Sequence, residues 1–273
     1  MHGAGNDFVL LDGRTGLPDD LSDLAPELAS RHFGVGCDQV LVVRAGKTAR
    51  FMMEIWNADG SRAEMCGNGI RCLAKWLYDR DEIGTNRQVI ETLGGPRWVE
   101  VDSTHEGLRI AVGMGVPSLD PMMLPMKPGC LVANVTTLEL AGHTIEVTGV
   151  SVGNPHAVAF VKDVEAFPLP LIGPLVENHP VFPERTNFEI VEVSNDAELV
   201  VRVWERGAGT TLACGTGAAA AAVAAITRGH CRPGRLALEM PGGRLDVTWD
   251  GPQAELMLHG PADTVFVGEW RPR

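Results

Sequence analysis

Short apolar runs, set off by turn-forming residues, recur along the chain and predict β-strands. In the first half they occupy residues 8–11, 40–43, 51–56, 98–101 and 108–112. In the second half they occupy residues 157–161, 188–193, 199–204, 236–240 and 245–249. We therefore expect strands to dominate the structure.

Two longer stretches predict helices, over about 68–80 and 216–228. Residues 217–226 are small and apolar on every side, and a helix of that kind is buried on every side. We therefore expect a sheet wrapped around a central helix. The first helix is more amphipathic, because Arg71 and Lys75 lie among its apolar residues. Shorter helices are expected over 21–31 and 170–178.

The second half of the chain repeats the first at an offset of 148 residues. This indicates an α+β fold of two structurally similar lobes, with residues 1–115 in one lobe and 116–262 in the other. The proline-rich stretch 116–128 is the expected linker. Equivalent positions are Gly5-Asn6 and Gly153-Asn154, Gln39 and Asn187, Trp56 and Trp204, Cys66-Gly67 and Cys214-Gly215, Gly69 and Gly217, and Gly94-Gly95 and Gly242-Gly243.

Composition narrows the classes of partner and cofactor. The net charge is −12 and the pI near 5.1, which argues against nucleic acid and anionic membranes as partners. Six cysteines without a secretion signal or a CxxC spacing favour reduced thiols over disulfides or a metal site. None of the four lysines lies in a glycine-rich phosphate-binding context, so we expect no Schiff base with pyridoxal phosphate.

The repeated motif CGxG carries the candidate chemistry. Cys66 and Cys214 each stand where the chain enters a predicted helix, and the positive end of a helix dipole lowers the pKa of a thiol. The glycines after them, Gly67 and Gly215, let backbone N–H groups reach a carboxylate. Two equivalent thiols suit a reaction that removes a proton from one face of a carbon and returns it on the other. The remaining cysteines, Cys37, Cys72, Cys130 and Cys231, are expected to be buried structural residues.

Other polar residues occupy equivalent places in the two halves. Asn6 and Asn154 each precede their cysteine by 60 residues, as turn formers or as ligand contacts. The halves differ where Asn57 faces Glu205, which Arg206 follows. Those two charges form either an exposed ion pair or a binding site for the ammonium and carboxylate of a substrate. His156, whose counterpart is Phe8, is either structural or able to tune a nearby thiol.

With these residues in place, the chain resembles the diaminopimelate epimerase family over nearly its whole length. The resemblance implies two similar lobes, each a mostly antiparallel sheet around a central helix, with the active site in the cleft between them. It implies cofactor-independent interconversion of LL- and meso-2,6-diaminopimelate by a cytoplasmic homodimer in lysine and peptidoglycan precursor synthesis. It also implies that a C-terminal strand, residues 263–273, returns to the first lobe. The matching segments are HGAGNDFVLLDGR, FGVGCDQVLVV, NADGSRAEMCGNGIRC, GNPHAV, PERTNFEIV and WERGAGTTLACGTGAAAAAVAA.

The same resemblance assigns roles to individual residues. Cys66 and Cys214 resemble the two catalytic thiols of the family, and His156 and Glu205 resemble the groups that adjust their ionisation. Arg206, together with Glu205, resembles the contacts to the non-reacting end of the substrate. The substrate-binding amides are expected at Asn6, Gln39, Asn57, Asn154 and Asn187, and the cradle for the reacting carboxylate at Gly67, Asn68, Gly215 and Thr216.

Three alternatives remain open at this point. A proline or hydroxyproline racemase of the same fold is the nearest, although Asn68 and Arg206 favour diaminopimelate. An amino-acid-binding protein without activity would have no use for paired thiols. A cysteine hydrolase needs one nucleophile and a base, so it gives no reason to repeat the thiol.

Overall fold

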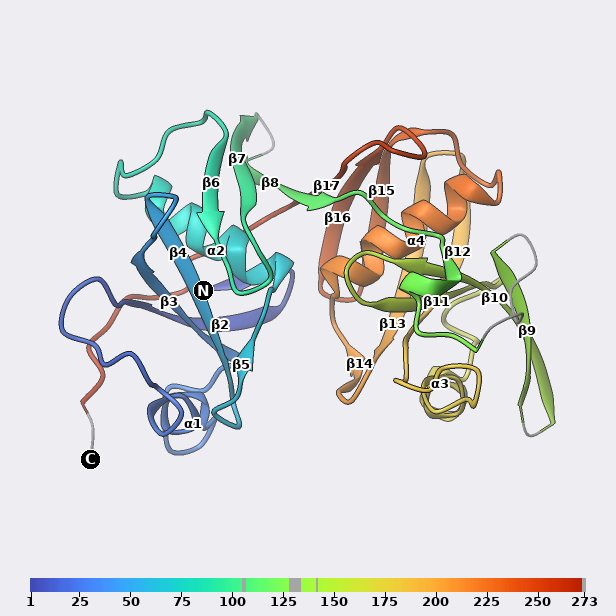
Figure 1. Ribbon diagram of the computed structural model, residues 1–273, viewed down its shortest axis with the longest axis horizontal. Helices are drawn as coiled ribbons and strands as arrows, with labels where there is room; N and C mark the ends of the chain where they lie inside the picture. Colours follow the sequence, from blue (N-terminus) through green and yellow to red (C-terminus); the bar gives the residue numbers. More distant parts are fainter. Residues whose placement is uncertain (105–106, 128–133, 141, 272–273) are drawn as a thin grey trace. The chain divides into compact units, whose positions relative to one another are not determined.

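The computed structural model describes residues 1–104, 107–127, 134–140 and 142–271 (Figure 1). The chain divides into two compact units, Met1–Gly113 together with His259–Arg273, and Met114–Leu258. These boundaries lie two and four residues from the positions 115 and 263 expected from the sequence.

The first unit is an α+β unit built mostly of antiparallel strand pairs. Only β2–β3 and β4–β6 are parallel among the pairs described for this unit. Its elements are β1 (His2–Gly3), β2 (Asn6–Asp12), α1 (Leu24–Ala29), β3 (Gln39–Ala45), β4 (Phe51–Asn57), β5 (Arg62–Ala63), α2 (Gly67–Tyr78), β6 (Gln88–Glu91), β7 (Arg97–Thr104) and β8 (Gly107–Gly115).

From β10 onward the second unit has the same order of elements, preceded by a 3-10 turn and the additional strand β9. Two parallel pairs, β11–β12 and β13–β15, again lie among antiparallel ones. After a short 3-10 turn, Pro121–Met123, come β9 (Val135–Leu140), β10 (His143–Ser151), β11 (Pro155–Phe160), α3 (Leu169–Glu177), β12 (Asn187–Asn195), β13 (Glu198–Glu205), β14 (Gly209–Thr211), α4 (Gly215–Thr227), β15 (Gly234–Met240), β16 (Gly243–Trp249) and β17 (Leu256–Gly260).

The strand register shows that the two units repeat each other residue by residue. The pairs β2–β3, β3–β4, β4–β5, β4–β6 and β6–β7 recur at the offset of 148 in the second unit, so the duplication is confirmed for these strand partners. The pairing of β1 with β2 differs by one residue from that of β10 with β11, since His2 pairs with Asp7 but Val150 pairs with His156. Matching pairs are Phe8–Gln39 with His156–Asn187, Val40–Trp56 with Phe188–Trp204, Ile55–Ala63 with Val203–Thr211, and Phe51–Ile90 with Leu199–Leu238.

A buried helix lies against the strands of each unit, as expected. In the second unit, α4 contacts six strands, and every residue from Gly217 to Ala225 is buried (Figure 1). Because its side chains are mostly methyl groups, strands approach the helix closely on all sides. In the first unit, the sequence placed Arg71 on a polar face of α2, but Arg71 is fully buried. Three oxygen acceptors satisfy its guanidinium, which is why the charge is tolerated there.

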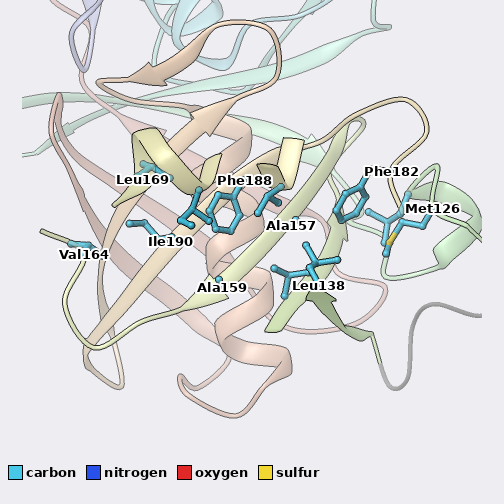
Figure 2. Packing of buried hydrophobic residues seen from close by; sticks show 13 residues of the cluster. Met126, Leu138, Ala157, Ala159, Val164, Leu169, Phe182, Phe188 and Ile190 are labelled. Atoms are coloured by element: carbon cyan, nitrogen blue, oxygen red, sulfur yellow. The ribbon is translucent and has the colours of Figure 1, made fainter. Parts of the chain in front are cut away.

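A second apolar layer packs between α3 and the outer face of its sheet (Figure 2). Phe188 and Ile190 of β12 point into this layer, whereas Glu189 between them points to the other face. In the first unit, α1 packs on β3 and β4 in the corresponding way, and Trp56 joins that core.

Two expectations about the connecting segments need correction. The described part of the expected linker, 116–127, lies in the second unit, in agreement with the expected range 116–262. It is not a bare linker, however, because Leu124 and Met126 are buried in the core of that unit. The expected C-terminal strand is reduced to one bridge, between Asp263 and His2. Residues 265–267 after it are 64–81% exposed, so no buried face holds them in a sheet. Pro128 and Cys130 lie outside the described residues.

Candidate active site

Each candidate catalytic cysteine is the N-cap of the central helix of its unit. Cys66 precedes α2 and Cys214 precedes α4, both in extended backbone conformation. Each sulfur accepts a hydrogen bond at 3.4 Å from the third residue of its helix, Gly69 or Gly217. The first N–H groups of a helix have no acceptor within the helix, so each sulfur stands beside a set of backbone donors. The predicted geometry at both cysteines is confirmed.

In the first unit, two asparagines surround the half-buried Cys66. Its Sγ donates to Oδ1 of Asn6 at 3.7 Å, and Asn68 Nδ2 donates to the same oxygen at 3.3 Å. Asn6 follows Gly5, whose φ of 84° turns the chain into β2. Asn68 Oδ1 in turn accepts from Arg71 at 2.8 Å. The network thus connects the thiol through two amides to a buried cation.

Two further amides of the first unit pair with each other. Gln39 on β3 donates from Nε2 to Oδ1 of Asn57 on β4 at 2.8 Å, as their strand register requires. Asn57 Nδ2 donates to Ser61 Oγ at 2.9 Å. The predicted amides therefore lie together at the end of neighbouring strands.

In the second unit, Thr216 and Asn154 stand where Asn68 and Asn6 stand in the first. Thr216 Oγ1 lies 3.4 Å from Cys214 Sγ and accepts from Asn154 Nδ2 at 3.4 Å. Asn154 Oδ1 lies 2.9 Å from Nε2 of His156, which is fully buried. The structure therefore brings three predicted residues into one hydrogen-bonded chain that ends at Cys214.

The ionisation of Cys214 differs from expectation. The position at the helix N-terminus predicted a lowered pKa, but the pKa of Cys214 is raised well above its usual range. Burial is the largest cause, and the negative charges of Glu205 and Glu189 add to it. The hydrogen bonds from Thr216 and Gly217 act in the opposite direction without overcoming burial.

Glu189 is a site residue that the sequence analysis missed. It is fully buried on β12, and its Oε1 lies 2.7 Å from Nδ1 of His156. Burial raises the pKa of its carboxyl, and the attraction of His156 partly offsets that rise. Glu189 is part of the apolar run 188–193, where it resembles a strand residue on a solvent-facing side. The signal available was its counterpart, Leu41, an apolar residue at the equivalent position.

The remaining candidates are Glu205 at the end of β13, Arg206 in the loop after it, and Asn187 at the start of β12. Glu205 accepts from Thr211 Oγ1 at 2.5 Å, and Arg206 donates from its guanidinium to the backbone oxygen of Glu184 at 3.1 Å. Asn187 is buried and bonds only to backbone groups in the contacts described, donating to Pro155 and accepting from Arg206. It therefore positions the loop that presents Arg206.

A second missed residue holds the same loop. Glu177, at the end of α3, is 5% exposed and accepts from Gly207 N at 2.9 Å. Its other oxygen accepts from Trp204 Nε1 at 2.7 Å. The sequence alone gave no sign of this contact, since Glu177 lies 28 residues before Glu205 on another element.

Within the described ranges, no group of three or more histidine, cysteine or acidic residues is arranged to hold a metal ion. In the same part of the chain, no helix is long and apolar enough to cross a membrane.

Comparison with known proteins places the chain among named relatives. The model of the diaminopimelate epimerase family matches residues 1–119 and 148–265. Diaminopimelate epimerase 1 of Nostoc sp. is 46% identical, covering 98% of this chain and 97% of that protein. The diaminopimelate epimerases of Pelotomaculum thermopropionicum and Xanthomonas euvesicatoria are each 43% identical, over 98% and 99% of this chain and 96% and 94% of those proteins.

Solved structures support the fold at lower identity. A PhzF-family phenazine biosynthesis protein of Bacillus anthracis has a TM-score of 0.65 and 16% identity, over 95% of this chain and 91% of that one. A hydroxyproline epimerase of Agrobacterium vitis has a TM-score of 0.63 and 15% identity, over 95% and 86%. These likenesses show the α+β epimerase fold alone. The match of the family model and the 46% identity over nearly the full length show that the chain belongs to the diaminopimelate epimerase family.

Proposed function

We propose that the chain epimerises LL-2,6-diaminopimelate to meso-diaminopimelate by a two-base mechanism that needs no cofactor. One of Cys66 and Cys214, as thiolate, takes the α-proton. The other, as thiol, delivers a proton to the opposite face of the same carbon. The two roles exchange when the reaction runs backwards, and no redox change or covalent intermediate is required.

The observation that carries this proposal is the equivalence of the two thiols. Each caps a buried helix, and each accepts from the third residue of that helix at the same 3.4 Å. A duplicated structural turn would account for the glycines but gives no reason for a cysteine in both copies. In the proposed reaction, the backbone N–H groups at Gly67-Asn68 and Gly215-Thr216 bind the carboxylate at the reacting carbon and stabilise the charge that develops there.

The unequal parts of the two units serve to recognise the far end of the substrate. Glu205 and Arg206 offer an anion and a cation where the first unit has Asn57 and Ala58. Diaminopimelate carries an ammonium and a carboxylate at its non-reacting carbon, so it offers a partner to each charge. The amides of Asn6, Gln39, Asn57 and Asn154 are proposed to bind the polar groups around the reacting carbon, and His156 and Glu205 to adjust thiol ionisation.

The test is epimerisation of LL-diaminopimelate in deuterated water. The parent enzyme should place solvent deuterium at the product α-carbon. Cys66→Ala and Cys214→Ala should each lose at least about 10³-fold in epimerisation, since each removes one of the two acid–base groups. Cys231→Ala is the matched control, because Cys231 is a buried cysteine that bonds to the backbone oxygen of Asn195. Near-normal epimerisation by either active-site variant would overturn the two-base proposal.

Substrate choice is tested separately. A hydroxyproline epimerase shares the fold, so proline and trans-4-hydroxyproline are assayed beside diaminopimelate. We expect turnover of diaminopimelate only, because a proline ring has no second charged end for Glu205 and Arg206. Faster turnover of proline or trans-4-hydroxyproline than of diaminopimelate would show that the proposed substrate is wrong.

We further propose that the enzyme is a cytoplasmic homodimer that works without pyridoxal phosphate in lysine and peptidoglycan precursor synthesis. Sedimentation of the purified chain should give twice the mass of 29.2 kDa. Carbonyl-trapping reagents that inactivate pyridoxal enzymes should leave its activity unchanged.

A further inference from the structure

A buried acid–base pair lies beneath the second cysteine and has no counterpart beneath the first. His156 on β11 and Glu189 on β12 are both fully buried, with Nδ1 and Oε1 2.7 Å apart. The two strands are parallel, with His156 opposite Asn187 and Val158 opposite Glu189, so both side chains point to the face that α4 covers. The carboxylate reaches the first turn of α4, since a Cβ on Gly217 would lie 2.9 Å from Oε1.

The equivalent pair in the first unit is apolar. Phe8 stands where His156 stands, and Leu41 stands where Glu189 stands. Leu41 reaches its helix in the same way, since a Cβ on Gly69 would lie 3.0 Å from its Cδ2. One copy of the fold therefore holds its cysteine over two hydrocarbon side chains. Because buried ion pairs are often replaceable by apolar residues without loss of stability, the fold itself does not require the His156–Glu189 pair.

The hydrogen bonds that lead from this pair to Thr216 have one direction. Asn154 Oδ1 is an amide oxygen and only accepts, so Nε2 of His156 must carry a proton and donate at 2.9 Å. Asn154 Nδ2 then donates to Thr216 Oγ1 at 3.4 Å. Thr216 Oγ1 also lies 3.4 Å from Cys214 Sγ. When Cys214 is a thiolate it has no proton to give, so in that state the Thr216 hydroxyl is the donor of this hydrogen bond.

We propose that Glu189 is a positioning residue for the epimerase reaction, which holds His156 with its proton on Nε2 and thereby aims the hydroxyl hydrogen of Thr216 at Cys214. A carboxyl beside Nδ1 fixes the tautomer and the orientation of an imidazole ring. This holds whether the shared proton lies on the carboxyl or on Nδ1, because Nε2 is protonated in both cases. The inference rests on the proposed function for its catalytic meaning, whereas its structural consequence at Cys214 is measurable without substrate.

The consequence is that the Thr216 hydroxyl donates a hydrogen bond to the thiolate of Cys214, whose formation its surroundings disfavour. Burial and the charges of Glu205 and Glu189 disfavour the thiolate of Cys214. A hydroxyl that donates to sulfur favours the thiolate. When Cys214 acts as base, the hydrogen bonds from Glu189 through His156 and Asn154 keep the Thr216 hydroxyl in place as this donor. At Cys66 the neighbouring group is instead an acceptor, Asn6 Oδ1, which suits a thiol.

Three variants of the full-length chain separate orientation from charge and packing. Glu189→Gln removes the charge, but its amide N–H still donates to Nδ1 and keeps Nε2 protonated. Glu189→Leu copies the first unit and removes the hydrogen bond. The double variant His156→Phe with Glu189→Leu copies the first unit at both places, so a folded structure is expected even if the single Leu variant is unstable. Glu198→Gln, on the neighbouring strand β13, is the control, because it removes a carboxylate that takes no part in the hydrogen bonds between Glu189 and Cys214.

Two readouts are measured at one fixed neutral pH. The first is the iodoacetamide alkylation rate of Cys214 and of Cys66 in the same molecule, resolved by peptide mass spectrometry. The second is kcat and KM for diaminopimelate. Because Glu189→Gln and Glu189→Leu both remove the charge that disfavours the thiolate, the comparison between these two variants isolates the hydrogen bond. We expect Glu189→Leu and the double variant to alkylate Cys214 about tenfold more slowly than Glu189→Gln and to leave Cys66 within about twofold, the size expected for one hydrogen bond to a charged group. We expect kcat of Glu189→Leu and of the double variant to fall at least tenfold below that of the parent, with KM little changed. Glu189→Gln should keep kcat and the alkylation rate of Cys214 within about threefold of the parent values.

The opposite patterns overturn the proposal. If Glu189→Gln is as impaired as Glu189→Leu, charge rather than orientation is responsible. If the rates at Cys66 and Cys214 fall equally, or if neither changes, Glu189 does not act on Cys214. Failure of the parent enzyme to epimerise diaminopimelate would refute the proposed function alone, because the ratio of the two alkylation rates still reports on Glu189.

Discussion

The carboxylate of Glu177 accepts a hydrogen bond from the indole Nε1 of Trp204 at 2.7 Å, while its other oxygen accepts from the backbone of Gly207 at 2.9 Å. One buried side chain at the end of α3 therefore holds both the end of β13 and the loop after it. Ala29 occupies the equivalent position in the first unit, so this anchor belongs only to the half that carries Arg206.

Removing that anchor should weaken substrate binding more than chemistry. In Glu177→Ala, the loop 205–207 loses a buried acceptor, and Trp204 Nε1 is left unsatisfied. We expect KM for diaminopimelate to rise about tenfold with kcat within threefold, and the free energy of unfolding to fall by about 1–3 kcal/mol. Glu184→Gln is the control, because Arg206 donates to the backbone oxygen of Glu184, which this substitution retains. Steady-state kinetics that show a fall in kcat alone would contradict this role.

The two helix glycines should differ in their tolerance of alanine. At Gly217 a Cβ would lie 2.9 Å from Glu189 Oε1 and 3.2 Å from Val203 Cγ2, so the His156–Glu189 contact must shift. At Gly69 the nearest atom is the end of the flexible Leu41 side chain, at 3.0 Å. We expect Gly217→Ala to lower the free energy of unfolding by about 1–3 kcal/mol, and Gly69→Ala by clearly less. Denaturant titration of both variants decides, and equal losses would refute the argument.

The buried guanidinium of Arg71 should be required for the stability of the folded chain. It donates to the oxygens of Gly67 at 3.2 Å, Asn68 at 2.8 Å and Pro261 at 3.3 Å. Arg71→Met leaves Asn68 and Pro261 without this donor, so we expect a loss of about 2–4 kcal/mol.

Arg71→Lys retains the charge but offers fewer directed donors, so its stability should fall between parent and Met variant. Thermal unfolding measures all three proteins. An Arg71→Met variant as stable as the parent would show that its oxygen partners find other donors.

Stability at alkaline pH should depend on Cys72. Burial raises its pKa to about 12 in the folded chain, from an ordinary value of 9.0. A raised pKa means that the folded state holds the proton more tightly, so its stabilisation is complete below pH 9 and is lost as the pH rises towards 12.

Between pH 10 and 11 this thiol alone should lower the free energy of unfolding by about 1.4 kcal/mol per pH unit. Cys72→Ala should remove that part of the slope, whatever its stability at neutral pH. Denaturant titrations of parent and variant across pH 8–11 provide the measurement, and parallel slopes would contradict the prediction.

Much of the fold followed from local pattern. The apolar runs, the alanine-rich helix and the offset of 148 are properties of the chain order, and the strand register of the two units repeats them pair by pair. The two cysteines at helix N-termini followed in the same way, since a cap is defined by residues within one turn. The C-terminal tail returns to the first unit as predicted, but the prediction that it forms a strand was wrong. Strand formation depends on a pairing partner elsewhere in the chain, and residues 265–267 remain exposed while Trp270 packs on the core of the first unit.

The repeated architecture, the family and the positions of Cys66 and Cys214 were predictable, because periodicity, repeat offset and motif spacing are properties of residue order. The surroundings of each thiol were not, because they depend on packing between elements that are distant in the chain. Glu189 lies 25 residues before Cys214 in the chain, yet its carboxylate affects that sulfur because β12 packs against the first turn of α4. Burial likewise raises the pKa of Cys214, although its position at the helix N-terminus predicted a lowered one. Desolvation depends on every neighbour at once, so it is set by packing and not by the residues on either side in the chain.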